Sequence, residues 1–268
     1  MIPNILTIAG SDPSGGAGIQ ADIKAISANG GYAMAVITAL TAQNTKGVTA
    51  VEMVSGPMIA AQIAALRADI DIHAIKIGML GDVATIETVA NALEGLDVPI
   101  VLDPVMVAKG GDRLLAADAV MALRERLLPR ASVLTPNLPE AADLLQTTEA
   151  TTLEEMRDQA FQLRATGCDA VLIKGGHLAG AMATDLLITS LGETALPAER
   201  FETSNTHGTG CTLSSALATQ IAFAHALPDA ARRAKAYITG AIMAAGDLSV
   251  GGGHGPVHHF HPQAENQT

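Results

Sequence analysis

A glycine-rich turn followed by a thiol occupies residues 205–212, which read NTHGTGCT. Gly208, Thr209 and Gly210 form the turn, and the apolar spacing after it predicts a helix over residues 209–225. Backbone N–H groups at the start of a helix point toward bound anions, so the turn predicts a site for a transferring phosphoryl group. Cys211 closes the turn, where a helix start is expected to lower the pKa of the thiol. Alternatively, Cys211 is a small buried helix residue.

The chain contains no GxxxxGK[ST] motif, so a lysine that accompanies this turn must come from elsewhere. Lys174 is the candidate, because it ends the apolar run AVLIK and precedes Gly175, Gly176 and His177. A lysine that closes a buried strand is uncommon on hydrophobic grounds, and an anionic ligand is its natural partner. The alternative is a lysine whose stem extends to solvent.

Acidic and amide residues follow two other apolar runs. Asp103 follows VPIVL, and the segment TPNLPE places Asn137 after a strand and Glu140 in the first turn of a helix. Magnesium is typically held by one or two carboxylates and water, so Asp103 and Glu140 are candidate ligands. The alternatives are capping or loop roles, because Asn137 stands where a helix N-cap would.

A second glycine-rich loop lies in residues 9–22, AGSDPSGGAGIQAD. Gly16, Gly18 and Ala21 match the spacing of a dinucleotide fingerprint. We reject that interpretation, because the loop is too long for the tight turn and no acidic residue ends the second strand. Glycines also let the backbone approach a flat ligand, so we interpret the loop as one wall of a substrate pocket.

Two polar residues near this loop have both a functional and a structural interpretation. Gln43 offers a donor and an acceptor side by side for the edge of a heterocycle, unless the backbone satisfies its amide. Asp22 either belongs to the pocket or is an acid favoured by the helix dipole. The histidine-rich segment 251–261 fits no defined zinc set, and we expect an exposed, partly ordered tail.

Short apolar runs alternate with longer helical patterns along the whole chain. This alternation predicts a mostly parallel sheet with helices on both faces and a ligand site beyond the carboxyl ends of the strands. The predicted strands cover residues 5–9, 35–40, 48–54, 74–77, 100–102, 132–134, 170–174 and 184–189. The predicted helices cover residues 18–29, 58–69, 83–94, 116–128, 139–145, 153–166, 209–225 and 229–246.

The composition limits the possible function classes. The chain has 268 residues and a formal net charge of −11, so neither nucleic acid nor an anionic membrane surface is an expected partner. Two cysteines, Cys168 and Cys211, do not make a disulfide framework. No run approaches the ~18 apolar residues of a membrane span, and the N-terminus lacks the pattern of a signal peptide. We therefore expect a cytoplasmic protein.

Taken together, these segments resemble the hydroxymethylpyrimidine/phosphomethylpyrimidine kinases of thiamine biosynthesis, in the ribokinase-like superfamily. The resemblance extends over residues 5–261. The segments that carry it are TIAGSDPSGGAGIQAD (7–22), TALTAQNT (38–45), KIGML (76–80), LDPVM (102–106), TPNLPEA (135–141), KGGH (174–177), NTHGTGCT (205–212) and GPVHHFH (255–261).

This resemblance implies one kinase domain (1–268) with a three-layer α/β/α fold, ATP and Mg²⁺ as cofactors, and two successive phosphorylations. The first acts on a hydroxymethyl group and the second on the resulting monophosphate. By position, the pyrimidine pocket would include Gly10, Asp22, Gln43, Met79 and Val105. The anion hole would comprise Gly208, Thr209, Gly210 and Cys211. Asn137, Lys174 and Thr209 would contact ATP, with Mg²⁺ near Asp103 and Glu140.

Many relatives of ribokinase place an aspartate base where Cys211 stands. A phosphate nucleophile is already ionised and a neutral thiol does not repel it, whereas an alcohol must lose a proton that a thiolate could accept. Cys211→Ala is therefore expected to impair alcohol phosphorylation more than phosphate phosphorylation.

Three alternatives stay open. A pyridoxal or pyridoxine kinase would share the fold. A thiol-dependent hydrolase using Cys211 and His207 lacks an evident third group to orient the base. A non-catalytic ligand-binding regulator would release no ADP. For quaternary structure, we expect a homodimer, because the helices are rich in Ala and Met.

Overall fold

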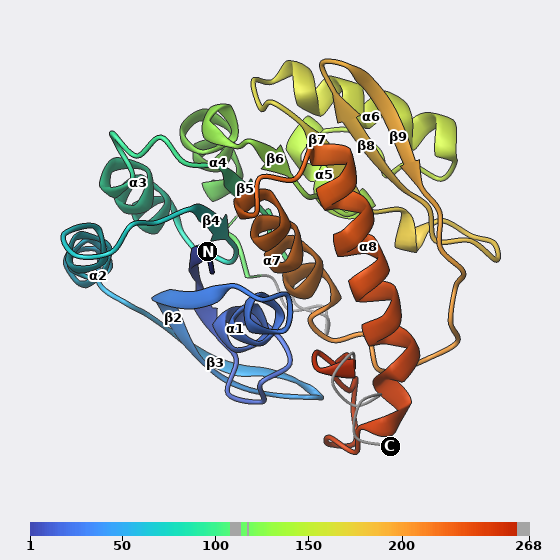
Figure 1. The fold of residues 1–268 in the computed structure, drawn as a ribbon, viewed down its shortest axis with the longest axis horizontal. Helices are drawn as coiled ribbons and strands as arrows, with labels where there is room; N and C mark the ends of the chain where they lie inside the picture. The colour runs from blue at the N-terminus through green and yellow to red at the C-terminus, as the bar shows by residue number, and fades with distance from the viewer. Residues whose placement is uncertain (108–113, 117, 262–268) are drawn as a thin grey trace.

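The computed structural model describes residues 1–107, 114–116 and 118–261, and its strands form one nine-stranded sheet (Figure 1). The order across the sheet is β3-β2-β1-β4-β5-β6-β7-β8-β9. The strands are β1 (Asn4–Ser11), β2 (Tyr32–Asn44), β3 (Gly47–Met53), β4 (Ala74–Ile77), β5 (Ile100–Leu102), β6 (Val133–Leu134), β7 (Val171–Ile173), β8 (Asp185–Thr189) and β9 (Gly192–Leu196). The strands from β2 to β7 in this order are parallel, and β3, β8 and β9 pair antiparallel at the two edges. The predicted mostly parallel α/β sheet is thus confirmed.

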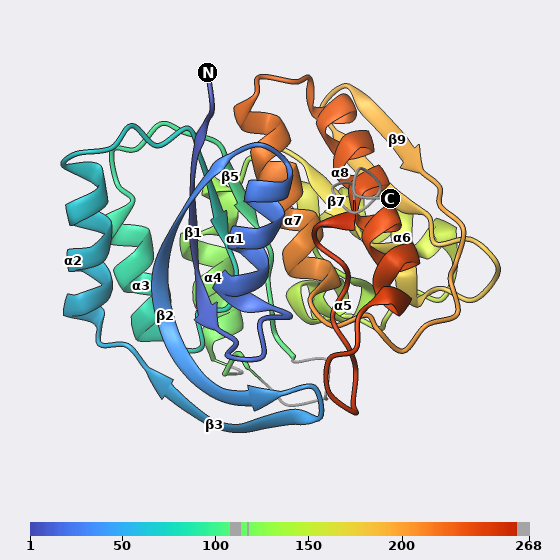
Figure 2. The same cartoon turned by 60° about the horizontal axis from the view of Figure 1, so that its bottom comes forward.

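Helices cover both faces of the sheet. They are α1 (Gly18–Ala28), α2 (Gly56–Arg67), α3 (Val83–Ala92), α4 (Ala119–Arg126), α5 (Leu138–Leu145), α6 (Leu153–Ala165), α7 (Thr209–Ala222) and α8 (Leu227–Met243), with short 3₁₀ turns at Leu128–Arg130, Gly175–His177 and Ala244–Asp247. Figure 2 shows α2 and α3 on one side of β1 and β2, and α1, α7 and α8 on the other. This is the three-layer α/β/α arrangement.

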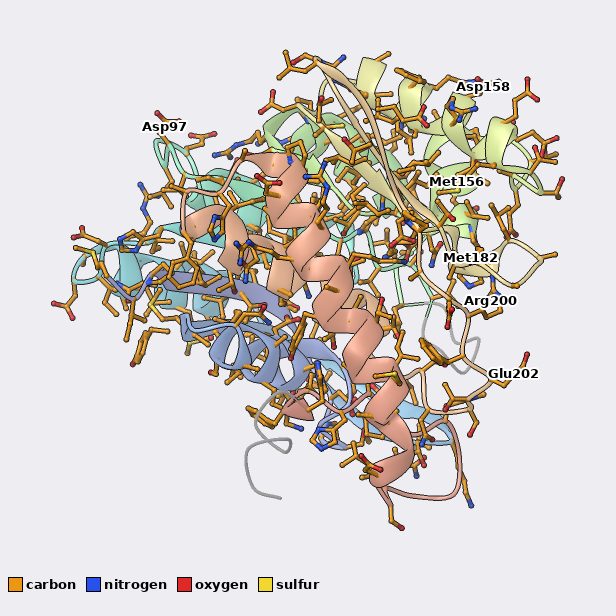
Figure 3. The ribbon with its side chains drawn as sticks, turned by 45° about the vertical axis from the view of Figure 1, so that its right-hand side comes forward. Asp97, Met156, Asp158, Met182, Arg200 and Glu202 are labelled. Carbon is orange, nitrogen blue, oxygen red and sulfur yellow. The ribbon has the colours of Figure 1, made fainter. Side chains whose placement is uncertain are left out.

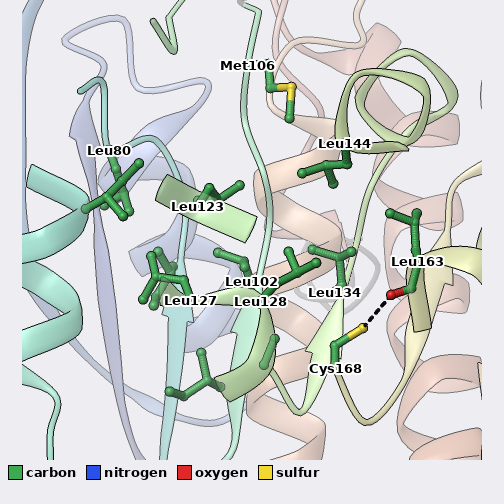
Figure 4. Packing of buried hydrophobic residues seen from close by; sticks show 14 of the residues in the cluster. Leu80, Leu102, Met106, Leu123, Leu127, Leu128, Leu134, Leu144, Leu163 and Cys168 are labelled. Atoms are coloured by element: carbon green, nitrogen blue, oxygen red, sulfur yellow. Dashed lines mark hydrogen bonds between the residues drawn. The ribbon is translucent and has the colours of Figure 1, made fainter. Parts of the chain in front are cut away.

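Each face of the sheet packs its own hydrophobic core, because successive strand residues point to opposite faces. In β5, Leu102 belongs to the core under α2 to α6, whereas Val101 belongs to the core under α1, α7 and α8. Leu134 and Val133 of β6 divide in the same way. Figure 4 shows part of the first core, where the Cys168 thiol lies 3.6 Å from the carbonyl oxygen of Leu163. Cys168 is therefore a core residue.

Some boundaries differ from the sequence-based expectation. Strand β9 was not predicted, because its sequence GETAL is short and mostly polar and it forms an exposed edge. Strand β2 begins at Tyr32, earlier than expected, and helix α4 is shorter than the predicted 116–128, a range that includes residue 117, outside the described residues. No helix in the described ranges is long and apolar enough to cross a membrane.

Candidate active site

A cavity of about 580 Å³ lies where the parallel strands end at their carboxyl side. Twelve of the thirteen predicted site residues line it, and Asp22 is the exception. The twelve are Gly10, Gln43, Met79, Asp103, Val105, Asn137, Glu140, Lys174, Gly208, Thr209, Gly210 and Cys211. Residues that lie far apart in the sequence therefore converge because the ends of parallel strands share one edge of the sheet.

The predicted anion turn opens α7. Gly208 is the N-cap residue and has φ 78° and ψ 8°, a left-handed conformation that favours glycine. A Cβ at Gly208 would also lie 1.7 Å from the carbonyl oxygen of Gly16, so the turn packs directly on the glycine-rich loop of residues 9–22. The hydroxyl and the backbone amide of Thr209 both donate to the carbonyl oxygen of Thr206, at 2.7 Å and 3.4 Å, and all four residues of the turn, Gly208 to Cys211, line the cavity.

The thiol of Cys211 differs from expectation. Burial raises the pKa of Cys211 to about 11, although the ammonium of Lys76 and the backbone amide of Gly18 oppose this rise. The predicted lowering of this pKa was wrong, because desolvation of the thiolate outweighs the favourable helix start. In the ligand-free chain, Cys211 is a neutral thiol at pH 7.

Lys174 lies beside the anion turn rather than in solvent. Its ammonium is 2.9 Å from Asp103 Oδ1 and 3.7 Å from Glu140 Oε2, and its side chain is only 15% exposed. A Cβ on Gly210 would lie 3.2 Å from Lys174 Nζ, so the lysine stands next to the turn. Burial alone would lower the pKa of Lys174, but Asp103 and Glu140 raise it, which keeps the side chain charged.

Asn137 and Glu140 form a capping box at the start of α5. Asn137 Oδ1 accepts from the Glu140 amide at 2.8 Å, and Glu140 Oε2 accepts from the Asn137 amide at 2.8 Å. The structural alternative for these residues therefore holds, and both also line the cavity. Burial raises the pKa of Glu140 to about 7. The ammonium of Lys174 opposes this rise, and the nearby carboxylate of Asp103 adds to it.

The donor set around Lys174 fits a magnesium ion. Asp103 and Glu140 contribute two carboxylates, and Lys174 is the one ammonium paired with both. A divalent cation would offset the remaining negative charge, and Mg²⁺ is commonly bound through one or two carboxylates with water. No group of three His, Cys, Asp or Glu side chains suited to a metal occurs within the described part of the chain.

Another part of the cavity lining has the properties of a pocket for a flat ring. A Cβ on Gly10 would lie 2.9 Å from Met79 Sδ, so this wall is close and partly apolar. Gln43 also lines the cavity, with its amide nitrogen 3.5 Å from His207 Nε2. Val105 is half-buried on the same lining.

Asp22 does not reach the cavity lining. Its carboxylate is fully buried and accepts from the Lys76 ammonium at 2.9 Å on each oxygen, from Ser215 Oγ at 2.8 Å and from Thr7 Oγ1 at 2.6 Å. Three donor side chains thus make four hydrogen bonds to the carboxylate and hold it outside the cavity lining, and the place of Asp22 in the pyrimidine pocket stays a prediction. Lys76 was missed, although a lysine inside the apolar strand AIKI was a visible signal.

Asp12 and His207 form a hydrogen-bonded contact that the sequence did not reveal. Asp12 Oδ2 lies 2.7 Å from His207 Nε2, and both residues line the cavity. Asp12 also accepts from Ser14 and from the Gly16 and Ala17 amides. A carboxylate followed by small residues is the pattern of an Asx turn, which was the available signal.

The C-terminal segment packs on the site, and the expected exposed tail was wrong for residues 255–257 and His259, which are buried, whereas residues 251–254 are exposed as expected. Pro256 bridges to His207, and the buried His259 places Nε2 3.1 Å from the hydroxyl of Thr212. Burial lowers the pKa of His259 to about 4, so its ring is neutral at pH 7. Tyr237 of α8 donates to the His259 carbonyl at 2.6 Å and holds this segment in place. Residues 262–268 of the expected tail lie outside the described residues.

Arg200 lies at the edge of the molecule and binds the loop that follows Lys174. Figure 3 shows Met182, Arg200 and Glu202 along this edge. The guanidinium of Arg200 donates to the carbonyls of Gly176 at 2.7 Å and Gly180 at 2.9 Å. Arg200 thereby fixes the loop that follows Lys174.

Comparison with known proteins agrees with this geometry. Residues 12–258 match the family model described as phosphomethylpyrimidine kinase. The hydroxymethylpyrimidine/phosphomethylpyrimidine kinase of Rhizobium meliloti (strain 1021) is 54% identical over 256 residues, which cover 96% of either chain. The crystal structure of a Bacillus subtilis pyridoxal kinase in an ADP complex aligns with a TM-score of 0.90 at 36% identity, over 98% of this chain and 99% of that chain. The phosphomethylpyrimidine kinase of Clostridium difficile 630 aligns with a TM-score of 0.78 at 40% identity, over 88% of this chain and 98% of that chain. The chain therefore belongs to the phosphomethylpyrimidine kinase family of phosphate-transferring enzymes.

Proposed function

We propose that this chain transfers the γ-phosphoryl group of ATP to 4-amino-5-hydroxymethyl-2-methylpyrimidine and then to the resulting monophosphate, in thiamine biosynthesis. The observation that carries the proposal is the meeting of Lys174 with the anion turn at Gly210, where a Cβ would lie 3.2 Å from the ammonium. A cation and a set of helix-start amides at one point stabilise the charge of a transferring phosphoryl group.

The two ends of the cavity divide the substrates between them. The acceptor ring is assigned to the wall formed by Gly10, Met79 and Val105, with Gln43 pairing with its polar edge. The nucleotide is assigned to the end lined by Asn137, Lys174 and Thr209. This division places the hydroxymethyl group of the acceptor toward the anion turn.

The first reaction forms a bond between the acceptor oxygen and the γ-phosphorus and breaks the bond from that phosphorus to the β,γ-bridging oxygen. ADP leaves with the electron pair, and the hydroxyl proton must move to a base. The amides of Gly208, Thr209, Gly210 and Cys211 would bind the oxygens of the transferring group. When bound, Mg²⁺ would add positive charge at the phosphates, and Asp103 and Glu140 would hold it.

The second reaction uses an oxygen of the acceptor monophosphate as the nucleophile. This oxygen is largely ionised at neutral pH, so no base is required. The neutral thiol of Cys211 suits this step, because a carboxylate at the same place would repel the incoming phosphate.

A pyridoxal kinase activity is the second candidate, and the TM-score of 0.90 to the Bacillus subtilis pyridoxal kinase is the observation that favours it. Both acceptors are flat heterocycles that carry a hydroxymethyl group, so one pocket of this shape can accept either.

The test is ADP formation by the purified chain with ATP and Mg²⁺. We expect turnover with the hydroxymethylpyrimidine and with its monophosphate, and a lower kcat/KM with pyridoxal or pyridoxine. Absence of ADP with both pyrimidines would refute the proposal, and ADP formed only with the pyridoxine series would establish the second candidate.

We further infer a homodimer in the cytoplasm that binds small molecules rather than nucleic acid or membranes. The outer edge of the sheet supports the dimer, because Leu40 on β2 and Val51 on β3 are 51% and 43% exposed. The acidic net charge of −11 supports the absence of a nucleic-acid partner. Sedimentation velocity of the wild type and of a Leu40→Lys, Val51→Lys variant tests the dimer.

A further inference from the structure

Resting on the proposed function, we propose that His207, oriented by Asp12, is the base that takes the proton from the alcohol acceptor in the first phosphorylation. The need for such a group follows from the thiol of Cys211, which is neutral in the ligand-free chain and so cannot accept a proton. His207 immediately precedes Gly208, so its ring projects from the same turn that would hold the transferring phosphoryl group.

The contacts of His207 define which ring nitrogen is available. Nε2 lies 2.7 Å from Asp12 Oδ2, and the side chains of His207 and Asp12 are only 8% and 3% exposed. Although burial alone would raise the pKa of Asp12, hydrogen bonds from His207, Ser14 and Ala17 lower it to about 2, so the carboxylate stays ionised. Nε2 therefore carries a proton and donates it to Asp12, which leaves Nδ1 as the acceptor in the neutral ring.

The position of Nδ1 suits a base. His207 lines the cavity. Within the described residues Nδ1 has no hydrogen-bond partner, and this atom keeps some exposure to solvent. The ring itself is held firmly, because a Cβ on Gly16 would lie 2.3 Å from His207 Cδ2 and 3.2 Å from Pro256 Cβ. A fixed imidazole that lines the cavity, with one nitrogen on a buried carboxylate and the other without a hydrogen-bond partner among the described residues, is the arrangement of a general base.

The chemistry balances without another reactant. The acceptor O–H proton passes to Nδ1, the acceptor oxygen bonds to the γ-phosphorus, and the bond to the β,γ-bridging oxygen breaks with its electron pair on ADP. Asp12 stabilises the imidazolium until Nδ1 returns the proton to water. The second phosphorylation starts from an ionised phosphate and does not need this base, so the two steps should depend differently on His207.

His207→Ala is the main test, with both acceptors measured on the same variant. We expect kcat for the alcohol acceptor to fall by about 10²–10⁴ and kcat for the monophosphate to fall by less than about tenfold. Added imidazole should restore the alcohol reaction in the space left by the ring and leave the monophosphate reaction unchanged. The control is His225→Ala, beyond the end of α7, which should keep both activities and show no response to imidazole.

Asp12→Asn tests the positioning role of Asp12. Loss of the carboxylate removes the partner of the imidazolium, so the acid limb of kcat/KM for the alcohol should move to lower pH and the plateau should fall. The other titratable group that faces His207 is His259 of the C-terminal segment, which in turn faces Lys24 and His258. Their charges are the same in the variant and the wild type.

Three outcomes would overturn the proposal. Equal losses for both acceptors without rescue by imidazole would make His207 a structural link between loops. Full alcohol activity in His207→Gln, which also serves if the alanine variant fails to fold, would exclude the base role. If Cys211→Ser lost only the alcohol reaction while His207→Gln kept it, the thiol of Cys211 would be the group that accepts the proton. A wild type that phosphorylates neither acceptor would instead refute the proposed function itself.

Discussion

Two lysines of one sheet, Lys76 inside β4 and Lys174 directly after β7, each pair with an aspartate at 2.9 Å, yet their surroundings differ. Lys76 is fully buried, and its partner Asp22 accepts four hydrogen bonds. Lys174 is 15% exposed, faces the cavity and shares its charge between Asp103 and Glu140. The buried pair of Lys76 and Asp22, in which one cation meets one anion, stabilises the fold. The group formed by Lys174, Asp103 and Glu140 has one cation for two carboxylates beside a cavity, so its charges are available to a ligand.

The largest expected effect is on stability, at Lys76. Lys76→Met leaves the Asp22 carboxylate buried without its cation, and we expect the free energy of unfolding to fall by about 3–5 kcal/mol. Urea unfolding measures the loss. The matched variant Lys76→Met, Asp22→Asn removes both charges and keeps an acceptor for Ser215 and Thr7, so it should recover most of the stability. A single variant as stable as the wild type would contradict the structural role of the pair.

The next effect is on catalysis, at Lys174. Lys174→Met removes the cation beside the anion turn, so we expect kcat/KM for ATP to fall by about 10²–10³ with either acceptor. The loss of stability should be smaller than for Lys76→Met, because water in the cavity can solvate Asp103 and Glu140. Steady-state kinetics and urea unfolding of the two methionine variants test this reversal. A Lys174 variant that is mainly unstable and still active would make the two lysines equivalent.

The smallest effect concerns the second acidic partner of Lys174. The pKa of Glu140 is raised to about 7, so the folded state binds a proton that the unfolded state releases near pH 4.5. The stabilising contribution of this proton is complete below pH 4.5 and is lost as the pH rises to 7. Glu140→Gln should therefore flatten the decline of unfolding free energy between pH 5 and 8 while keeping the cap of α5. An identical pH dependence in wild type and variant would contradict the raised pKa.

Much of the fold was predictable because apolar periodicity depends on local sequence. The runs that became β1, β4 and β5 are short and continuous, as expected of strands buried on both faces. Strand β9 was missed because it is polar and exposed, and its pairing with β8 is decided by tertiary contacts. The same distinction applies to the C-terminal segment, whose polar sequence did not show that Val257 and His259 are buried.

For the site, the sequence by itself determined which residues could do chemistry, because glycine turns, amides and carboxylates at strand ends have recognisable local patterns. Only the tertiary structure decided their states and partners. Its packing around the half-buried Cys211 raises the pKa of the thiol, it pairs Asp22 with Lys76 outside the cavity lining, and it brings Asp12 to His207 across 195 residues. The physical reason is that desolvation and pairing depend on which atoms meet in space, and the spacing of residues along a chain does not specify these meetings.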